Sequence, residues 1–290
     1  MKASIIIVGY KGEKYLDDCL TSLSNLNFPK KDYEIIYVDN ASPDKGIEIA
    51  EKYQKQLKNL KIIKSEKNLG FAEGNNIGIK QAQGKYIILF NQDAIADENF
   101  LLELIKAAEL DKKIGAVGAK IYYLNSRDLY FAGGKILYGG FCWNWLLGDK
   151  EGKCDYVSGC AMLMRKDVLD KVGLLDKNLF CYYEETDLCT RIKKAGYKIY
   201  YSPKAIAWHN VAKKSKRASQ HITYYMHRNR VIYCYKHYKH KNIFLLLDTL
   251  FFYNLFFIYE MLRVPGSSRF IKEVWQARKD SLNYCLNYCR

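Results

Sequence analysis

The stretch EETD, residues 184–187, gathers three carboxylates at the start of a predicted helix: Glu184, Glu185 and Asp187. Acids at a helix N-terminus complement the helix dipole, which is a sufficient structural reason for their presence. Carboxylates crowded in this way also repel one another, and this raises a pKa and suits a general base. The residues alone leave both interpretations open.

A second group of polar side chains follows a predicted buried strand. In YIILFNQDA, residues 86–94, five apolar residues precede Asn91, Gln92 and Asp93. Asn and Asp favour turns, so a turn would explain them. Alternatively, the strand is a rigid stem that presents Asp93 to a cation or a phosphate. The rest of the chain has to decide between these alternatives.

The elements that would position these residues alternate along the first part of the chain. Apolar runs predict strands at 4–8, 34–38, 60–64, 86–90 and 114–119, and helical periodicity predicts helices at 13–26, 43–57, 72–82 and 98–109. This alternation predicts an α/β fold with a doubly wound, mostly parallel sheet flanked by helices. No G-x-G-x-x-G follows the first strand and no Walker lysine loop is present, so a dinucleotide fold is not indicated.

Three of the predicted strands end in polar or glycine-containing tips. The first strand ends in Val8, Gly9 and Tyr10, the second in Val38, Asp39 and Asn40, and the fourth in Phe90 followed by Asn91–Asp93. Ligands of doubly wound sheets bind beyond the carboxyl ends of the strands. A turn would be enough to explain one polar strand end. Three polar ends at the carboxyl edge of one sheet predict a ligand-binding site.

The segment NLGFAEGNNIGI, residues 68–79, puts Gly and Asn where helix propensity would avoid them. Glycines at a helix start allow close backbone approach, and free N–H groups there can meet an anion. Alternatively, Gly74 and Gly78 only let the helix pack tightly on the sheet.

Together with GKYIILFNQDA, residues 84–94, this segment resembles the inverting GT-A glycosyltransferases of family 2, especially their rhamnosyltransferase-like branch. Residues 157–209, from VSGCAMLMRK to AIAWH, are similar to the acceptor half of that family: a small-residue turn, a helix, an acidic pair and a distant histidine follow in this order. The matching segments span about residues 3–210.

The resemblance implies a divalent cation, Mn²⁺ or Mg²⁺, that bridges the diphosphate of a nucleotide sugar. Asp93 would bind this cation. The family usually carries D-x-D here, whereas this chain has Asn91-Gln92-Asp93. A further ligand is therefore expected, and His209 occupies the matching position, although a lone histidine after a strand is often structural.

The resemblance also implies that Asp39 hydrogen-bonds a pyrimidine base, with a local turn cap as the alternative, since DNASPD is rich in turn residues. Further nucleotide-binding residues are expected at Val8, Gly9, Tyr10, Asn68, Gly70, Asn75, Asn91 and Gln92. The expected donor is dTDP- or UDP-linked.

On the acceptor side, the family's second acid deprotonates the acceptor hydroxyl, and that position is Glu185. Glu184 is the second candidate, Asp187 and Arg191 are supports, and Gly159 lies on the acceptor side. Direct displacement with one base inverts the anomeric centre without a covalent intermediate. The expected acceptor is a glycan or a polyprenyl-linked hydroxyl.

The charge is unevenly distributed along the 290 residues. Residues 1–190 carry 26 Lys and Arg against 27 Asp and Glu, whereas residues 191–290 carry 20 against 4. Such asymmetry is typical of a nucleic-acid or anionic-membrane surface. We therefore expect a catalytic domain at 1–212 (donor half 1–119, acceptor half 120–212) and a basic, tyrosine-rich helical extension at 213–290. Nine cysteines without a C-x-x-C pair predict a reduced, cytosolic chain.

The apolar segment 243–262 is long enough to cross a bilayer as a helix. Asp248 and Glu260 argue against a span, because an acid at mid-bilayer is costly. Beside the basic stretch, the segment better suits peripheral attachment to an anionic membrane, on the inner face of the cell membrane. Packing against the catalytic domain, or against the partner in a homodimer, is the alternative.

Two other classes of function remain open. The basic, tyrosine-rich tail could bind single-stranded nucleic acid, which we regard as the less favoured partner. Asn91 and Glu185 at motif positions could instead indicate a nucleotide-binding protein of the same fold with weak or no catalysis. The glycosyltransferase is the favoured hypothesis.

Overall fold

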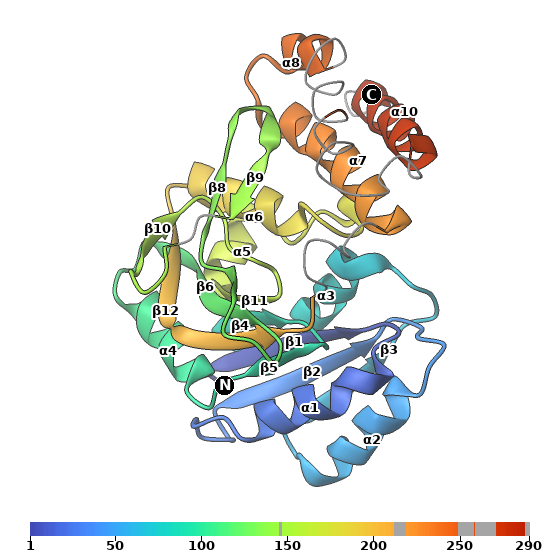
Figure 1. Ribbon diagram of the computed structural model, residues 1–290. Coiled ribbons are helices and arrows are strands. Elements are labelled where there is room, and N and C mark those ends of the chain that lie inside the picture. Colours follow the sequence, from blue (N-terminus) through green and yellow to red (C-terminus); the bar gives the residue numbers. More distant parts are fainter. Residues whose placement is uncertain (145–146, 212–218, 249–257, 259–270, 288–290) are drawn as a thin grey trace. The chain divides into compact units, whose positions relative to one another are not determined.

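The computed structural model describes residues 1–144, 147–211, 219–248, 258 and 271–287 (Figure 1). The chain divides into two compact units. Unit 1 comprises Met1–Lys135, Asn144–Phe180 and Glu184–Val211, and unit 2 comprises Ile136–Trp143, Cys181–Tyr183 and Ala212–Arg290. Two short segments of the predicted acceptor half, 136–143 and 181–183, are thus part of unit 2.

Unit 1 is built on one ten-stranded sheet with the order β10-β12-β6-β11-β4-β1-β2-β3, in which β5 also pairs with β12 and β7 with β6. Its strands are β1 (Ala3–Gly9), β2 (Tyr33–Asp39), β3 (Leu60–Lys64), β4 (Tyr86–Phe90), β5 (Ala94–Ala96), β6 (Ile114–Tyr123), β7 (Leu129–Phe131), β10 (Gly152–Cys154), β11 (Ala161–Arg165) and β12 (Lys198–His209). β8 (Gly134–Ile136) and β9 (Cys142–Asn144) form a separate two-stranded sheet.

The amino-terminal part of the sheet is parallel, as predicted. β1 pairs in parallel with β2 and β4, and β2 with β3, and every residue of β4 is buried. Full burial explains the unbroken apolar run of β4, because helices cover both faces of such a strand. β11 then enters between β4 and β6 and is antiparallel to both. The predicted α/β sheet is confirmed, with this antiparallel strand at its centre.

The helices of unit 1 are α1 (Glu13–Ser24), α2 (Gly46–Gln56), α3 (Gly70–Gln81), α4 (Phe100–Glu109), α5 (Lys166–Val172) and α6 (Glu184–Lys194), with a single 3₁₀ turn at η2 (Lys177–Leu179). In Figure 1, α1 and α2 lie on one side of β1–β3, and α3 lies on the other. A Cβ added to Gly78 would approach Ile6 Cγ2 to 2.4 Å, and one on Gly74 would approach Val8 Cγ1 to 2.8 Å. These two glycines of α3 therefore serve close packing of the helix on β1.

Unit 2 contains η1 (Tyr138–Gly140) and the helices α7 (Gln220–His237), α8 (Lys241–Leu247) and α10 (Ile271–Asn287). Arg230 is buried, donates to the Gly139 carbonyl at 2.8 Å and pairs with Asp248 at 2.6 Å. Asp248, which argued against a membrane span, is thus neutralised inside this unit. Tyr224 ties α7 to α10 by donating to Asp280 at 2.6 Å.

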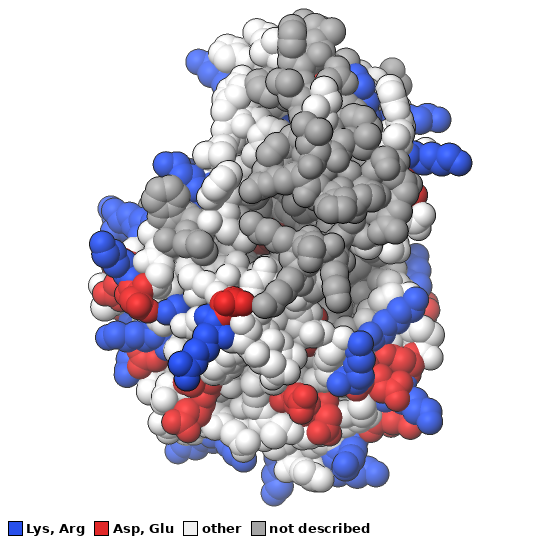
Figure 2. All heavy atoms as spheres, viewed as in Figure 1, with Lys and Arg blue, Asp and Glu red and all other residues white. Residues whose placement is uncertain are grey.

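Most of the predicted apolar segment 243–262 lies outside the described residues, as do 213–217 of the basic stretch. Among the helices that the structure does describe, none has the length and apolar content to cross a bilayer. Figure 2 shows acidic and basic side chains interspersed over unit 1 on the face in view.

Candidate active site

Gln92 joins the tips of β1 and β4. Its side-chain amide donates to the Tyr10 carbonyl at 2.8 Å, and its Oε1 accepts from the Tyr10 N–H at 3.1 Å. A Cβ on Gly12 would lie 2.0 Å from Gln92 Oε1, so only glycine leaves room for this bridge. The tip of β2 joins the same edge, because the Asn40 N–H donates to the Gly9 carbonyl at 2.9 Å. The three predicted polar tips thus lie side by side.

His209 meets the tip of β4, although it lies 116 residues away from Asp93 in the chain. Its register partner in β5 is Ala94, and the Asn210 N–H donates to the Asp93 carbonyl at 3.0 Å. His209 Nε2 is consequently 3.1 Å from both Asp93 Oδ1 and Asn91 Nδ2. Burial by itself lowers the pKa of His209, but Cys160 and the Asp93 carboxylate beside it raise the pKa above its usual value.

The donor atoms at this tip suit a divalent cation. Asp93 provides a carboxylate, His209 an imidazole, and Asn91 a buried amide oxygen that has no hydrogen-bond partner among the described residues. Carboxylate and amide oxygens suit Mg²⁺ and Mn²⁺, and the imidazole favours the transition metal. No group of three or more His, Cys, Asp or Glu side chains with metal-site geometry occurs in the described part of the chain. A cation held here would therefore need diphosphate oxygens or water to complete its shell.

Asp39 ends β2 with its side chain largely buried, and burial raises its pKa. The Ser42 N–H donates to its Oδ1 at 3.3 Å, which is the turn-capping contact that the sequence offered as an alternative. Its second carboxylate oxygen is not used by that contact. The two interpretations of Asp39 are compatible in this geometry.

Asn40 belongs to the polar tip predicted after the second strand, but the sequence analysis gave it no role. It is buried, its Nδ2 donates to Asn68 Oδ1 at 3.0 Å and to the Gly70 carbonyl at 3.1 Å, and its Oδ1 accepts from the Leu69 N–H at 3.0 Å. Asn40 thereby fixes the backbone that starts α3 beside the tip of β2. The signal was present, since Asn40 directly follows Asp39, but its partners lie about 30 residues away.

The other predicted residues of the α3 segment behave differently. Asn68 Oδ1 also accepts from the Gly70 N–H at 2.9 Å, which fits Gly70 in its left-handed conformation with φ of 78°. Asn75 is buried and donates to the Phe71 carbonyl one turn earlier, at 2.9 Å. Its amide nitrogen is therefore engaged within its own helix and not directed at the sheet edge.

Glu184 and Glu185 form a coupled carboxyl pair at the start of α6. Burial raises the pKa of both, and the neighbouring Glu185 raises that of Glu184 further. The hydrogen bond between them acts in opposite directions, raising the pKa of Glu184 and lowering that of Glu185. Burial and mutual repulsion therefore favour a proton on this pair, and the two carboxyls titrate together.

Asp187 lies near this pair, because its charge also raises the pKa of Glu184, and it pairs with Arg191. Asp187 is fully buried, and the distance between the two charged groups is 2.8 Å. The Arg191 guanidinium also donates to the carbonyls of Val172, Gly173 and Leu174 at 2.6, 3.1 and 2.7 Å. These two residues fasten α6 to the end of α5, so they position the carboxyl pair.

Gly159 connects the acidic pair to the strand tips. A Cβ there would lie 3.6 Å from Glu185 Cβ and 3.3 Å from Phe71 Cε1, so Gly159 packs between the carboxyl pair and the start of α3. Its neighbour Cys160 accepts from the Asn91 N–H at 3.0 Å. Contacts therefore run without a gap from Glu185 through Gly159 to Asn91, and through Phe71 to the segment held by Asn40.

Comparisons with known proteins show the family to which the chain belongs. Residues 4–173 match Glycosyl transferase family 2, and the chain belongs to that family. Poly(ribitol-phosphate) beta-N-acetylglucosaminyltransferase TarS from Staphylococcus aureus is 38% identical over 94 residues, which cover 32% of this chain and 16% of TarS. The chain thus matches only about a sixth of that relative's length. A second relative, from Methanococcus voltae, is named dolichyl N-acetyl-alpha-D-glucosaminyl phosphate 3-beta-D-2,3-diacetamido-2,3-dideoxy-beta-D-glucuronosyltransferase. It is 28% identical to this chain over an alignment that covers 76% of this chain and 71% of that protein.

Solved structures show the same fold. TarS residues 1–349 in complex with UDP-GlcNAc superpose with a TM-score of 0.65 at 19% identity, covering 98% of this chain and 81% of the other. A mannosyltransferase from Pyrobaculum calidifontis in complex with GDP-Man and Mn²⁺ gives 0.63 at 14% identity, covering 100% and 88%. The fold is that of a GT-A glycosyltransferase. The three names differ in the sugar, so the rhamnosyltransferase-like branch stays a prediction.

Proposed function

We propose that this protein transfers a sugar from a nucleotide-diphosphate donor to an acceptor hydroxyl. The observation that carries the proposal is the continuous set of contacts joining Asp39–Asn40, the Asn91–Asp93 tip with His209, and the Glu185 carboxylate. Glycosyl transfer needs a grip on the nucleotide, a charge partner for the leaving diphosphate and a base at the acceptor. One group of residues is available at this edge for each task.

On the donor side, Asp39 binds the base of the nucleotide, and the tip Val8–Tyr10 borders the nucleotide; Gly9 there leaves room for the Tyr37 side chain, since a Cβ would lie 2.0 Å from its hydroxyl oxygen. The start of α3 borders the same site, and its backbone is held by Asn40 and Asn68, which accept from the Leu69 and Gly70 N–H groups. Asp93 and His209 would hold a divalent cation, Mn²⁺ or Mg²⁺, with Asn91 as a further oxygen donor. When bound, this cation neutralises charge on the departing diphosphate.

On the acceptor side, Glu185 accepts the proton of the attacking hydroxyl, and Glu184 donates a hydrogen bond that keeps Glu185 ionised. Asp187 and Arg191 hold the helix that carries both. One base on one face of the sugar corresponds to a single displacement, so we propose inversion of the anomeric centre. The acceptor is a glycan or a polyprenyl-linked sugar.

A titration of UDP, GDP and dTDP with and without Mn²⁺ tests the donor site by calorimetry. We expect one nucleotide to bind in a Mn²⁺-dependent manner, and Asp93→Ala to abolish the Mn²⁺ dependence without lowering the melting temperature, because Asp93 lies at a strand tip. Asp97→Ala, which removes a carboxylate four residues further along the chain, is the matched control. Equal affinity in wild type and Asp93→Ala would remove Asp93 from the cation site.

We further propose that the basic carboxyl-terminal part attaches the enzyme to the inner face of the membrane, where such an acceptor resides. The supporting observation is the charge excess of residues 191–290, with 20 Lys and Arg against 4 Asp and Glu. Each basic residue near an anionic surface contributes about 1 kcal/mol, which salt weakens.

A further inference from the structure

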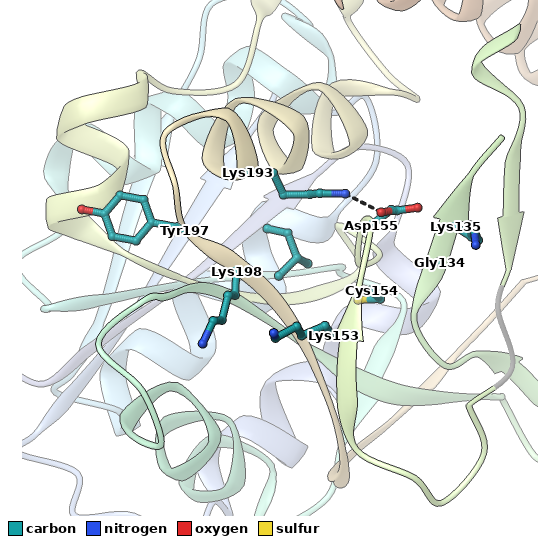
Figure 3. A pocket seen from close by; sticks show the side chains of 9 residues that line it. Gly134, Lys135, Lys153, Cys154, Asp155, Lys193, Tyr197 and Lys198 are labelled. Carbon is teal, nitrogen blue, oxygen red and sulfur yellow. Dashed lines mark hydrogen bonds and ion pairs between the residues drawn. The ribbon is translucent and has the colours of Figure 1, made fainter. Parts of the chain in front are cut away.

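Helix α6 carries the carboxyl pair at its start, and its later turns are fastened within unit 1. Asp187 pairs with Arg191, which donates to the end of α5. Lys193, in the last turn, pairs with Asp155, and Figure 3 shows this pair in the wall of a cavity of about 510 Å³. These contacts hold α6 from Asp187 onward, whereas the backbone that leads into Glu184 is held by other residues.

The backbone that leads into Glu184 has an unusual conformation. Phe180, Tyr182 and Tyr183 have φ of 61°, 68° and 71°, in the left-handed region that bulky side chains rarely adopt. None of them is a glycine, so each carries a steric cost that the surrounding structure has to offset. Strained backbone of this kind is concentrated at functional sites. Here it immediately precedes the carboxyl pair in the chain.

One buried side chain of α7 holds the peptide groups of this segment. Asn229 is fully buried, and its Nδ2 donates to the carbonyls of Cys181 and Tyr182 at 2.9 and 2.8 Å. Its Oδ1 accepts from Arg228 Nη1 at 2.7 Å, so the nitrogen end of the amide faces the segment. A carboxylate of the same shape could donate to neither carbonyl. The position therefore requires an amide.

Tyr183 anchors the last residue of the segment. Its side chain is buried, and its hydroxyl donates to the Gly140 carbonyl at 2.9 Å. Its ring centroid lies 5.9 Å from that of Tyr233 on α7, and both rings belong to one apolar cluster with Cys234 and Phe244. The segment is thus held through its backbone and through a side chain.

The acceptor of that hydroxyl is itself fixed on α7. Gly140 has φ of 74°, and a Cβ there would lie 2.4 Å from Cys234 Sγ, so η1 packs against the helix with no room for a side chain. The Arg230 guanidinium donates to the adjacent Gly139 carbonyl at 2.8 Å. Both anchors of the segment, the buried asparagine and η1, therefore depend on α7.

We infer that Asn229 is a positioning residue for the carboxyl pair. By holding the carbonyls of residues 181 and 182, it maintains the left-handed backbone of Tyr182 and Tyr183 and sets how the chain enters α6 at Glu184. This inference rests on the proposed glycosyl transfer, in which Glu185 is the base. A displacement of about 1 Å at a catalytic group can cost about 10²-fold in rate, so the entry to this helix affects turnover.

Hydrogen–deuterium exchange tests the structural half of the inference without turnover. Asn229→Asp at pH 8 keeps the shape of the side chain and puts an oxygen in place of the donating nitrogen. We expect amides of residues 180–187 to exchange at least about fivefold faster than in the wild type, because the segment opens more often. Asn242→Asp, the same change at an exposed position of α8, is the matched control and should leave their exchange unchanged.

Hydrolysis of a nucleotide sugar tests the catalytic half. Water replaces the acceptor: its oxygen bonds to the anomeric carbon, the bond from that carbon to the diphosphate breaks, and Glu185 accepts the proton. UDP-GlcNAc, GDP-Man and dTDP-rhamnose are each supplied with Mn²⁺, and the sugar that the wild type hydrolyses fastest is used. In Asn229→Asp we expect kcat to fall by at least about tenfold and KM to change by less than about twofold, because the donor site is intact.

A double variant shows whether Asn229 acts through Glu185. In a Glu185→Gln background, Asn229→Asp should lower kcat by less than about a further twofold, because the base that it positions is already absent. Tyr183→Phe removes only the hydroxyl that donates to Gly140 and should change exchange and kcat in the same direction. It carries the test if melting temperatures show that Asn229→Asp does not fold.

Unchanged exchange or unchanged kcat in folded Asn229→Asp would overturn the inference. So would a further tenfold loss in the double variant, because Asn229 would then act independently of the base. Absence of hydrolysis of all three sugars by the wild type would be a failure of the proposed function. That failure is recognised separately, because the exchange contrast between Asn229→Asp and Asn242→Asp does not depend on turnover.

Discussion

Glu184 and Glu185 form a buried, coupled carboxyl pair, and at the scale of single residues we assign Glu185 the role of the base and Glu184 that of its hydrogen-bond donor. Glu185→Gln retains shape and removes the base, so turnover should fall by at least about 10²-fold while nucleotide affinity is unchanged. Glu184→Gln keeps a hydrogen-bond donor beside Glu185 and should retain most activity. Transfer assays of both variants with a radiolabelled donor decide between them. If Glu184→Gln abolished turnover and Glu185→Gln left it normal, Glu184 would be the base and Glu185 its hydrogen-bond partner.

The raised pKa of Glu184 also has a consequence for stability. A carboxyl whose pKa is higher in the folded than in the unfolded protein binds more protons when folded, so its contribution to stability is present below the unfolded pKa and is lost as pH rises through the folded pKa. The free energy of unfolding should therefore decline from about pH 4.3 upward by about 1.4 kcal/mol per unit of pKa difference. In Glu184→Gln, urea titrations across pH should show a smaller decline. An unchanged pH dependence would contradict the assignment.

At the scale of elements, the packing of α3 on β1 depends on Gly78. Alanine in place of an exposed helical glycine usually stabilises a helix, but here the added Cβ would lie 2.4 Å from Ile6 Cγ2, in a fully buried side chain. We expect Gly78→Ala to lower the free energy of unfolding by about 1–3 kcal/mol. Gly152→Ala, where a Cβ meets nothing within 4 Å, is the matched control and should change stability by less than about 1 kcal/mol. Chemical denaturation measures the free energy of unfolding of both variants. Equal values would mean that α3 can shift away from β1 without loss of stability, which would contradict the prediction.

At the scale of the whole molecule, the charge excess of the last hundred residues predicts reversible attachment to anionic membranes. The full-length protein should float with phosphatidylglycerol vesicles at low salt and be released at about 0.5 M salt, where exposed charges are screened beyond a few Å. Neutral phosphatidylcholine vesicles are the control. Recovery in the soluble fraction with both lipids at low salt would contradict the prediction.

Much of the parallel sheet could be predicted from the sequence. The predicted strands at 86–90 and 60–64 agree with β4 and β3 to the residue. An unbroken or alternating run of apolar residues is typical of a strand within a sheet, and this pattern is local in the sequence. The helix predicted from residue 72 begins at Gly70, where the hydrogen bonds of Asn40 and Asn68 set the start. Neither bond is visible in a local pattern.

The sequence indicated which residue types are candidates for the site. Only the structure shows which of these residues lie in contact. Asp93 and His209 meet because β5 pairs with β12, and Gly159 packs against Glu185 because β11 enters the sheet beside β4.

The sequence by itself therefore determined the class of fold, the strand tips and the acids available for catalysis, since periodicity and burial are local properties. Only the tertiary structure decided that Asn40 organises the start of α3 and that Asp187 and Arg191 fasten a helix. Strand order and register depend on pairings between segments far apart in the chain, and no local pattern encodes those pairings.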